Sequence, residues 1–193
     1  SVVPAPNTIL KNICKLEPGH SLTVTSNGEF LKTKYYAVDD IKINYNIKEN
    51  EIIEESERLL MSAIEKRFYT ADVDVGVLLS GGLDSSLIVA MAAKSKLSKI
   101  NTFSIGFPTI NDEVGDEFYY SDMVSKQFKT NHYKYNINQD HLMESLDDVI
   151  REMPEPMFSQ DSSAFYLLAK EVSAHQKVVL SGQGADELFG GYF

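Results

Sequence analysis

The sequence predicts an α/β fold in which a parallel sheet carries helices on both faces, preceded by a small β-hairpin segment. Three observations support this prediction. From residue 49 onward, short apolar runs alternate with longer segments of helical periodicity. Two of the apolar runs end in glycine-rich turns that lead into helical segments. The first 48 residues are rich in turn signals instead, so we divide the chain into a lead-in segment, 1–48, and an α/β domain, 49–193.

The lead-in segment contains a strong hairpin signal. Residues 16–20 (LEPGH) read as a turn, and two strand-like runs, 21–25 and 30–36, flank the pair Asn27-Gly28. An Asn-Gly pair suits a turn with positive φ. Because an isolated hairpin is only marginally stable in water, we expect this one to pack against another part of the protein.

The α/β domain opens with an amphipathic segment, 49–69, which we expect to form a helix that covers one face of the sheet. Its charged residues are expected to form a solvated face. Further strands are predicted near residues 74–79, 101–106, 132–137 and 177–180, and further helices near 84–97, 117–129, 139–151 and 162–175. The helix at 84–97 is apolar nearly all round, which predicts that it is well buried.

The first glycine turn, residues 80–86 (SGGLDSS), joins the apolar run 74–79 to that helix. A strand, a glycine turn and a helix in this order aim backbone N–H groups and the positive end of the helix at one point, which favours a phosphate group. Glycines allow close approach of the backbone, and the serines add hydroxyl donors. The alternative is a purely structural turn in which Asp84 caps the helix.

Asp84 limits which ligands the first turn can bind. A carboxylate beside a phosphate repels it unless a cation lies between them, so Asp84 implies Mg²⁺. The turn lacks the Gly-Lys-Ser/Thr of a Walker A loop.

The second glycine turn, residues 181–192 (SGQGADELFGGY), follows the short apolar run 177–180. Asp186 stands at a place matching Asp84 in the first turn, and two such turns side by side could share one Mg²⁺–pyrophosphate. Ligands of parallel sheets bind at the carboxyl ends of strands, where Ser80, residues 105–107 and Ser181 all fall. Taken alone, this turn could also be a glycine-rich helix start with Asp186 as N-cap.

The first motif resembles the SGGxDS loop of the PP-loop ATP pyrophosphatases, which implies an adenine nucleotide alpha-hydrolase-like fold. Both motifs together, with residues 102–107 (TFSIGF), resemble the synthetase domain of glutamine-dependent asparagine synthetases over essentially the whole chain. The resemblance implies that the ATP phosphates are held by Ser80, Gly81, Gly82, Asp84, Ser85 and Ser86. It implies that Leu78 and Ile105 flank the adenine, and that Ser181, Gly182 and Asp186 border the aspartyl-adenylate and its metal.

The resemblance implies a ligase that forms an amide at the expense of ATP. The side-chain carboxylate of aspartate, or of a related carboxylic acid, would attack the α-phosphate and release pyrophosphate, and ammonia would then displace AMP. An ionised carboxylate needs no general base, so positioning and neutralisation of phosphate charge supply most of the catalysis. Asp84 and Asp186 with Mg²⁺ suit that task. The resemblance is also compatible with a homodimer.

Several features depart from that family. Gln183 stands where many relatives have an acidic residue, and an amide cannot accept a proton from ammonia. The chain begins with Ser1 rather than a nucleophilic cysteine, so ammonia is expected from a glutaminase domain that is absent here. It stops at Phe193, short of the family's domain end, as expected of a truncated chain, a natural fragment or one piece of a larger protein. His132 stands where the family often has a histidine, but a lone histidine at a strand start is more often structural.

Composition excludes other classes of protein. The 193 residues include 28 Asp and Glu against 18 Lys and Arg, a net charge of −10, and 43% are hydrophobic, enough for a sizeable core. Because phosphate neutralisation dominates nucleic-acid affinity, we expect no nucleic-acid partner. Cys14 is the only cysteine, so no disulfide framework exists. No membrane span or signal peptide is evident, and we expect a cytoplasmic protein without a membrane partner.

Two alternatives stay open. The chain could belong to a related ligase that amidates another carboxylate, such as a sugar acid or a peptide-like acid. It could instead be a nucleotide-binding fragment that keeps the first turn but is inactive alone.

Overall fold

The central sheet is parallel, as the sequence predicts. The computed structural model describes residues 3–95, 99–107, 118–155 and 160–191. Within these residues, four parallel strands form one sheet in the order β5-β4-β3-β6. The strands are β3 (Val75–Leu78), β4 (Asn101–Gly106), β5 (Asn131–Asn136) and β6 (Val178–Leu180). The glycine turns follow β3 and β6, which are neighbours, so both turns leave the same edge of the sheet.

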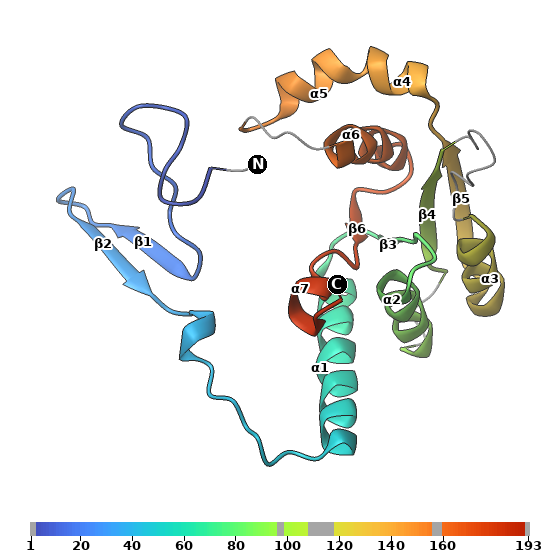
Figure 1. Cartoon of the computed structure of the whole chain (residues 1–193), viewed down its shortest axis with the longest axis horizontal. Coiled ribbons are helices and arrows are strands. Elements are labelled where there is room, and N and C mark those ends of the chain that lie inside the picture. Colours follow the sequence, from blue (N-terminus) through green and yellow to red (C-terminus); the bar gives the residue numbers. More distant parts are fainter. Residues whose placement is uncertain (1–2, 96–98, 108–117, 156–159, 192–193) are drawn as a thin grey trace.

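Helices cover both faces of this sheet (Figure 1). One face carries α1 (Glu49–Thr70), α2 (Leu83–Lys94) and α3 (Phe118–Phe128). On the other face α6 (Gln160–Ser173) packs against the sheet, and α4 (Gln139–Glu144) and α5 (Leu146–Glu152) pack against α6. The short α7 (Ala185–Phe189) follows β6. The predicted α/β fold with helices on both faces is therefore confirmed.

Two hydrophobic clusters hold the layers together. Because strand side chains alternate between faces, Val77 and Leu79 enter the cluster with α1 and α2, whereas Leu78 enters the cluster with α6. In the second cluster the buried Phe103 stacks on Tyr133 with ring centroids 5.2 Å apart.

The helix expected over 139–151 is interrupted. It is split at Ser145, which ends α4 and precedes α5. The Ser145 hydroxyl is buried and donates to the carbonyl of Leu142 at 3.0 Å, a local bond that competes with regular helix hydrogen bonding. The predicted end of the helix at 84–97 and the first residue of the helix at 117–129 lie outside the described residues.

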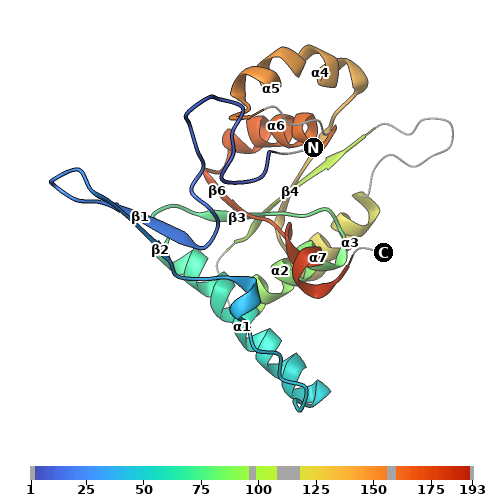
Figure 2. The ribbon, with the colours of Figure 1, turned by 60° about the vertical axis from the view of Figure 1, so that its left-hand side comes forward.

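The predicted burial of α1 and α2 holds only in part. Ile64 of α1 is buried, but Ile52 and Ile53 are 47% and 57% exposed, so only the second half of α1 covers the sheet (Figure 2). In α2, Val89 is fully buried whereas Leu83 in the first turn is 82% exposed. The first turn of α2 belongs to the site described below.

The predicted hairpin is present as β1 (His20–Val24) paired antiparallel with β2 (Phe30–Lys34), followed by a short 3-10 helix at Val38–Asp40. Gly28 supplies the expected positive φ, +84°. The expectation that the hairpin packs on another element is wrong for the described residues, because nearly all of both strands is exposed (Figures 1 and 2). The lead-in segment is tied to the sheet domain by an ion pair of 2.5 Å between Lys15 and Glu155.

No helix in the described part of the chain is long and apolar enough to cross a lipid bilayer.

Candidate active site

The first glycine turn needs glycine at position 81 for two reasons. Gly81 has φ +93°, a conformation that side chains rarely adopt. A Cβ there would also lie 2.7 Å from both the Ser121 nitrogen and the Tyr120 Cβ at the start of α3. The turn therefore packs closely against α3, and a larger residue at position 81 would displace either the turn or α3.

Ser80 and Ser85 brace this turn from within. The Ser80 hydroxyl accepts a hydrogen bond from the Gly82 N–H at 3.2 Å and lies 3.0 Å from the Ser85 hydroxyl. Ser85 Oγ is also 3.2 Å from the Gly82 carbonyl oxygen, to which it can donate. These bonds hold the turn in shape and use both hydroxyl protons of the pair.

The first turn of α2 has unsatisfied hydrogen-bond donors. Gly82 is its N-cap residue and provides no side-chain cap, so the N–H groups of the helix's first turn keep free hydrogen-bonding capacity. Ser86 Oγ is buried and has no hydrogen-bond partner among the described residues. An orphaned hydroxyl and uncapped N–H groups fit a phosphate. Asp84 is in this first turn and is partly buried, and the structural alternative with Asp84 as N-cap is not observed.

The second glycine turn touches the first. A Cβ on Gly182 would lie 3.0 Å from both the Asp84 Cβ and the Ser85 nitrogen. The Ser181 hydroxyl accepts from the Gln183 N–H at 3.1 Å, which shapes the turn, and the Gln183 side chain is exposed. Gly182 thus forms a backbone cradle against the start of α2, and the two predicted motifs meet.

Asp186 lies in the first turn of α7, and its carboxylate lies near Gly191, just after the C-terminal end of that helix. Gly184, with φ +94°, is the N-cap of α7, so Asp186 does not cap it. A Cβ on Gly191 would overlap the Asp186 carboxylate, which lies against the Gly191 backbone. The described residues contain no group of three or more His, Cys, Asp or Glu side chains that could hold a metal. Carboxylates such as those of Asp84 and Asp186 are the ligand type that Mg²⁺ takes, commonly one or two together with ligand phosphates and water.

Leu78 and Ile105 lie on one face of neighbouring strands. Both are partly buried and pack against the cluster of Phe103, Leu168 and Val172. They stand at the ends of β3 and β4, beside the first turn, where the resemblance places the adenine.

Comparison with known proteins identifies the family. The sequence model of the family described as asparagine synthase matches residues 55–193. The chain belongs to the asparagine synthase family. Within it, a protein of Methanocaldococcus jannaschii that bears the name of a glutamine-hydrolyzing asparagine synthetase is 37% identical over 192 residues, 98% of this chain and 36% of the relative. Asparagine synthetase [glutamine-hydrolyzing] 1 of Bacillus subtilis is 30% identical over 98% of this chain and 29% of its own length.

The chain therefore spans about a third of the length of these asparagine synthase relatives. Among solved structures, the NH3-dependent NAD synthetase of Campylobacter jejuni aligns with a TM-score of 0.49 and 15% identity, over 72% of this chain and 60% of that one.

Four residues around the first turn of this asparagine synthase family member were not predicted from the sequence as site residues. Tyr120 and Ser121 lie against Gly81, and the Ser104 hydroxyl donates to the carbonyl of Leu79 just before the turn. His132 is within hydrogen-bonding distance of both serines, 3.3 Å from Ser121 and 3.5 Å from Ser104. Ser104 lies in the motif 102–107 and His132 stands where the family often has a histidine, but the sequence does not show that any of the four reaches the turn, because each does so from another strand or helix.

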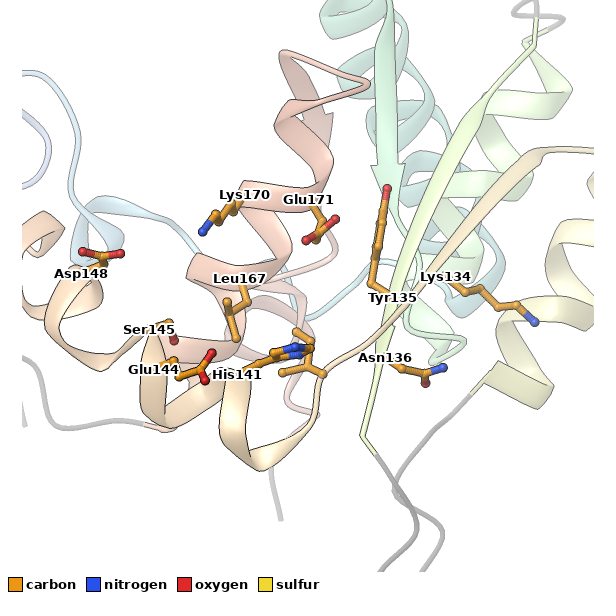
Figure 3. Close-up of a pocket in the computed structure, with 11 residues that line it drawn as sticks. Lys134, Tyr135, Asn136, His141, Glu144, Ser145, Asp148, Leu167, Lys170 and Glu171 are labelled. Carbon is orange, nitrogen blue, oxygen red and sulfur yellow. The ribbon is translucent and has the colours of Figure 1, made fainter.

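A cavity of about 390 Å³ lies away from both glycine turns, between the end of β5 and helices α4, α5 and α6 (Figure 3). Its lining mixes both signs of charge, with Lys170 and Glu171 on α6 and Glu144 and Asp148 on α4 and α5. Burial, followed by the nearby Glu171, raises the pKa of Tyr135 on this wall. Neither glycine turn contributes to the lining, so the cavity is separate from the candidate active site.

Proposed function

We propose that this chain carries the ATP-binding part of an amide-forming ligase of the asparagine synthetase type. The observation that carries the proposal is the contact of Gly182 with Asp84 and Ser85, which joins the two glycine turns at the ends of β3 and β6. Family membership supports the same conclusion. The aspartate substrate, the ammonia source and the use of Mg²⁺ belong to the proposal.

Binding of ATP is assigned to the first turn. The uncapped N–H groups of α2 and the Ser86 hydroxyl would donate to phosphate oxygens, and the Gly182 cradle would close over them. Each interaction with the end of a helix stabilises a charge by about 0.3–1 kcal/mol when exposed, so several donors must act together. Asp84 and Asp186 would hold Mg²⁺, which would neutralise phosphate charge when bound.

The proposed reaction has two steps. A side-chain oxygen of aspartate forms a bond to the α-phosphorus of ATP, and the bond from that phosphorus to the bridging oxygen breaks as pyrophosphate leaves. Ammonia then attacks the acyl carbon, AMP leaves, and the nitrogen loses a proton. The chain's residues position the phosphates for the first step. Correct positioning of the reacting groups can remove a large part of the activation free energy of such a reaction. Gln183 cannot take the proton in the second step, because an amide has no basic site.

The direct test is pyrophosphate release by this chain from ATP, Mg²⁺ and ammonia. Aspartate, a sugar acid and a peptide-like acid are supplied in turn, with Asp84→Ala as the control. Release that needs aspartate and is lost in the control would support the proposal. Release with another acid only would identify a relative with a different acceptor.

A second candidate function is nucleotide binding without catalysis. The exposed Gln183 amide, which cannot accept a proton from ammonia, favours it. Binding of ATP without pyrophosphate release from any acid would support this candidate against the ligase.

A further inference from the structure

A single histidine lies at the centre of a polar cluster beneath the first glycine turn. The His132 side chain, on β5, is only 8% exposed. Its Nδ1 is 2.9 Å from the Thr102 hydroxyl, and its Nε2 is 3.3 Å from Ser121 Oγ and 3.5 Å from Ser104 Oγ. These three hydroxyl residues are themselves buried. A buried polar cluster of this kind holds its members in one arrangement, because a broken bond leaves a costly unpaired group.

Two members of the cluster contact the turn directly. The Ser104 hydroxyl donates to the carbonyl of Leu79, the residue before Ser80. The Ser121 backbone nitrogen lies 2.7 Å from the place where a Cβ of Gly81 would be, so α3 is seated against the turn. His132 therefore touches both supports of the turn, from β4 and from α3, although it does not contact the turn itself.

The directions of the hydrogen bonds place a proton on His132 Nε2. Ser104 commits its one proton to Leu79, and Ser121 donates to the Phe118 carbonyl at 3.2 Å, so both hydroxyl oxygens are left as acceptors for His132. On the other side of the ring, Thr130 donates to Ser125 at 2.9 Å and lies 2.8 Å from the Thr102 hydroxyl, so Thr102 donates to Thr130 and its oxygen faces Nδ1.

Charged groups of both signs lie near the ring. Asp122 of α3 has a carboxylate oxygen 3.8 Å from His132 Nε2, but its other oxygen pairs with Lys134 of β5 at 2.9 Å. From β4, the ring faces the hydroxyls of Thr102 and Ser104 and the Thr102 backbone. Burial lowers the pKa of His132; Lys134 adds to this effect, whereas Asp122 and the Thr102 backbone oppose it.

We infer that His132 is a positioning residue for the phosphate-binding turn, whose ring fixes Ser104 and Ser121 and through them residues 79–81. The inference rests on the proposed function only in taking this turn as the site of the ATP phosphates.

The test compares His132→Leu, His132→Gln and the matched control His141→Leu, whose histidine is exposed on α4. Glutamine offers a neutral N–H donor and a carbonyl acceptor, whereas leucine offers neither. Backbone amide hydrogen exchange over residues 80–86 is measured without ligand, and ATP affinity with Mg²⁺ is measured by calorimetry between pH 5 and 8. The thermal midpoint is recorded for every variant.

In His132→Leu we expect faster amide exchange over residues 80–86. We also expect a roughly tenfold loss of ATP affinity, because the hydrogen bonds that orient the supports of the turn are lost. Glutamine should restore both. Because burial lowers the pKa of His132, we expect the unmodified chain to lose affinity only toward the acid end of this range, and His132→Gln, which does not titrate, should not lose it. The control should match the unmodified chain.

A His132→Leu variant with a lowered thermal midpoint but unchanged exchange and affinity would overturn the inference, since that is the result of a role in the core alone. If ATP fails to bind even the unmodified chain, but exchange over residues 80–86 responds to His132→Leu and recovers in His132→Gln, the proposed function fails and the positioning role stands.

Discussion

Adding a methyl group at Gly182 probes the contact between the two glycine turns. A Cβ there would lie 3.0 Å from the Asp84 Cβ and the Ser85 nitrogen, whereas ordinary contacts begin at 3.4 Å. The turns must therefore separate by about 0.4 Å, and overpacking of this kind costs roughly 1–3 kcal/mol. Gly182 does not have positive φ, so Gly182→Ala introduces no backbone strain.

The cost should appear mainly in ligand binding. If the start of α2 holds the phosphates, Gly182→Ala should weaken ATP binding in the presence of Mg²⁺ by roughly tenfold, since 1.4 kcal/mol corresponds to a factor of ten. Calorimetry measures this affinity, and Gly28→Ala is the matched control. Gly28 has φ +84° with nothing within 4 Å, so alanine there should lower stability but leave affinity unchanged. Unchanged affinity in a folded Gly182→Ala sample would refute the reasoning.

Three further changes test the fold and its pH dependence. Gly81→Ala combines positive φ with a 2.7 Å clash and should lower the thermal midpoint by several degrees, at about 1–3 kcal/mol of strain; calorimetric scanning showing no shift would contradict this. Ile64→Ala should cost about 2–5 kcal/mol of unfolding free energy and the exposed Ile53→Ala about 0.5 or less, so equal losses in urea would argue against the packing of α1. Because burial lowers the pKa of His132, the unfolded state binds that proton more tightly. The stability this residue contributes should be complete above about pH 6.5 and lost as the pH falls through the lowered pKa, with a flatter pH profile in His132→Gln.

Local patterns predicted the framework of the site. The apolar run before Ser80 and the apolar helix after it are contiguous in sequence, so strand, turn and helix could be placed from one short segment. The second turn could be placed beside the first because parallel strands present their carboxyl ends at one edge. The contact of Gly182 with Asp84 agrees with that expectation.

Contacts made at long range could not be predicted in the same way. Ser121 reaches Gly81 from a helix 40 positions later, and His132 reaches both supports of the turn from another strand. The sequence shows neither, because no periodicity reports which side chains of different elements meet. The exposure of the hairpin could not be predicted for the same reason. The pattern of β1 and β2 predicts that the two strands pair, but it does not predict what they pack against.

Calorimetric titration of ATP with and without Mg²⁺, on this chain and on Asp84→Ala, tests the central claim most directly. We predict binding that requires Mg²⁺ and is lost in Asp84→Ala, while the variant keeps the thermal midpoint of the unmodified chain. Binding of equal strength in Asp84→Ala, or no binding by the folded unmodified chain, would contradict the assignment of the phosphate site to the two glycine turns of this chain.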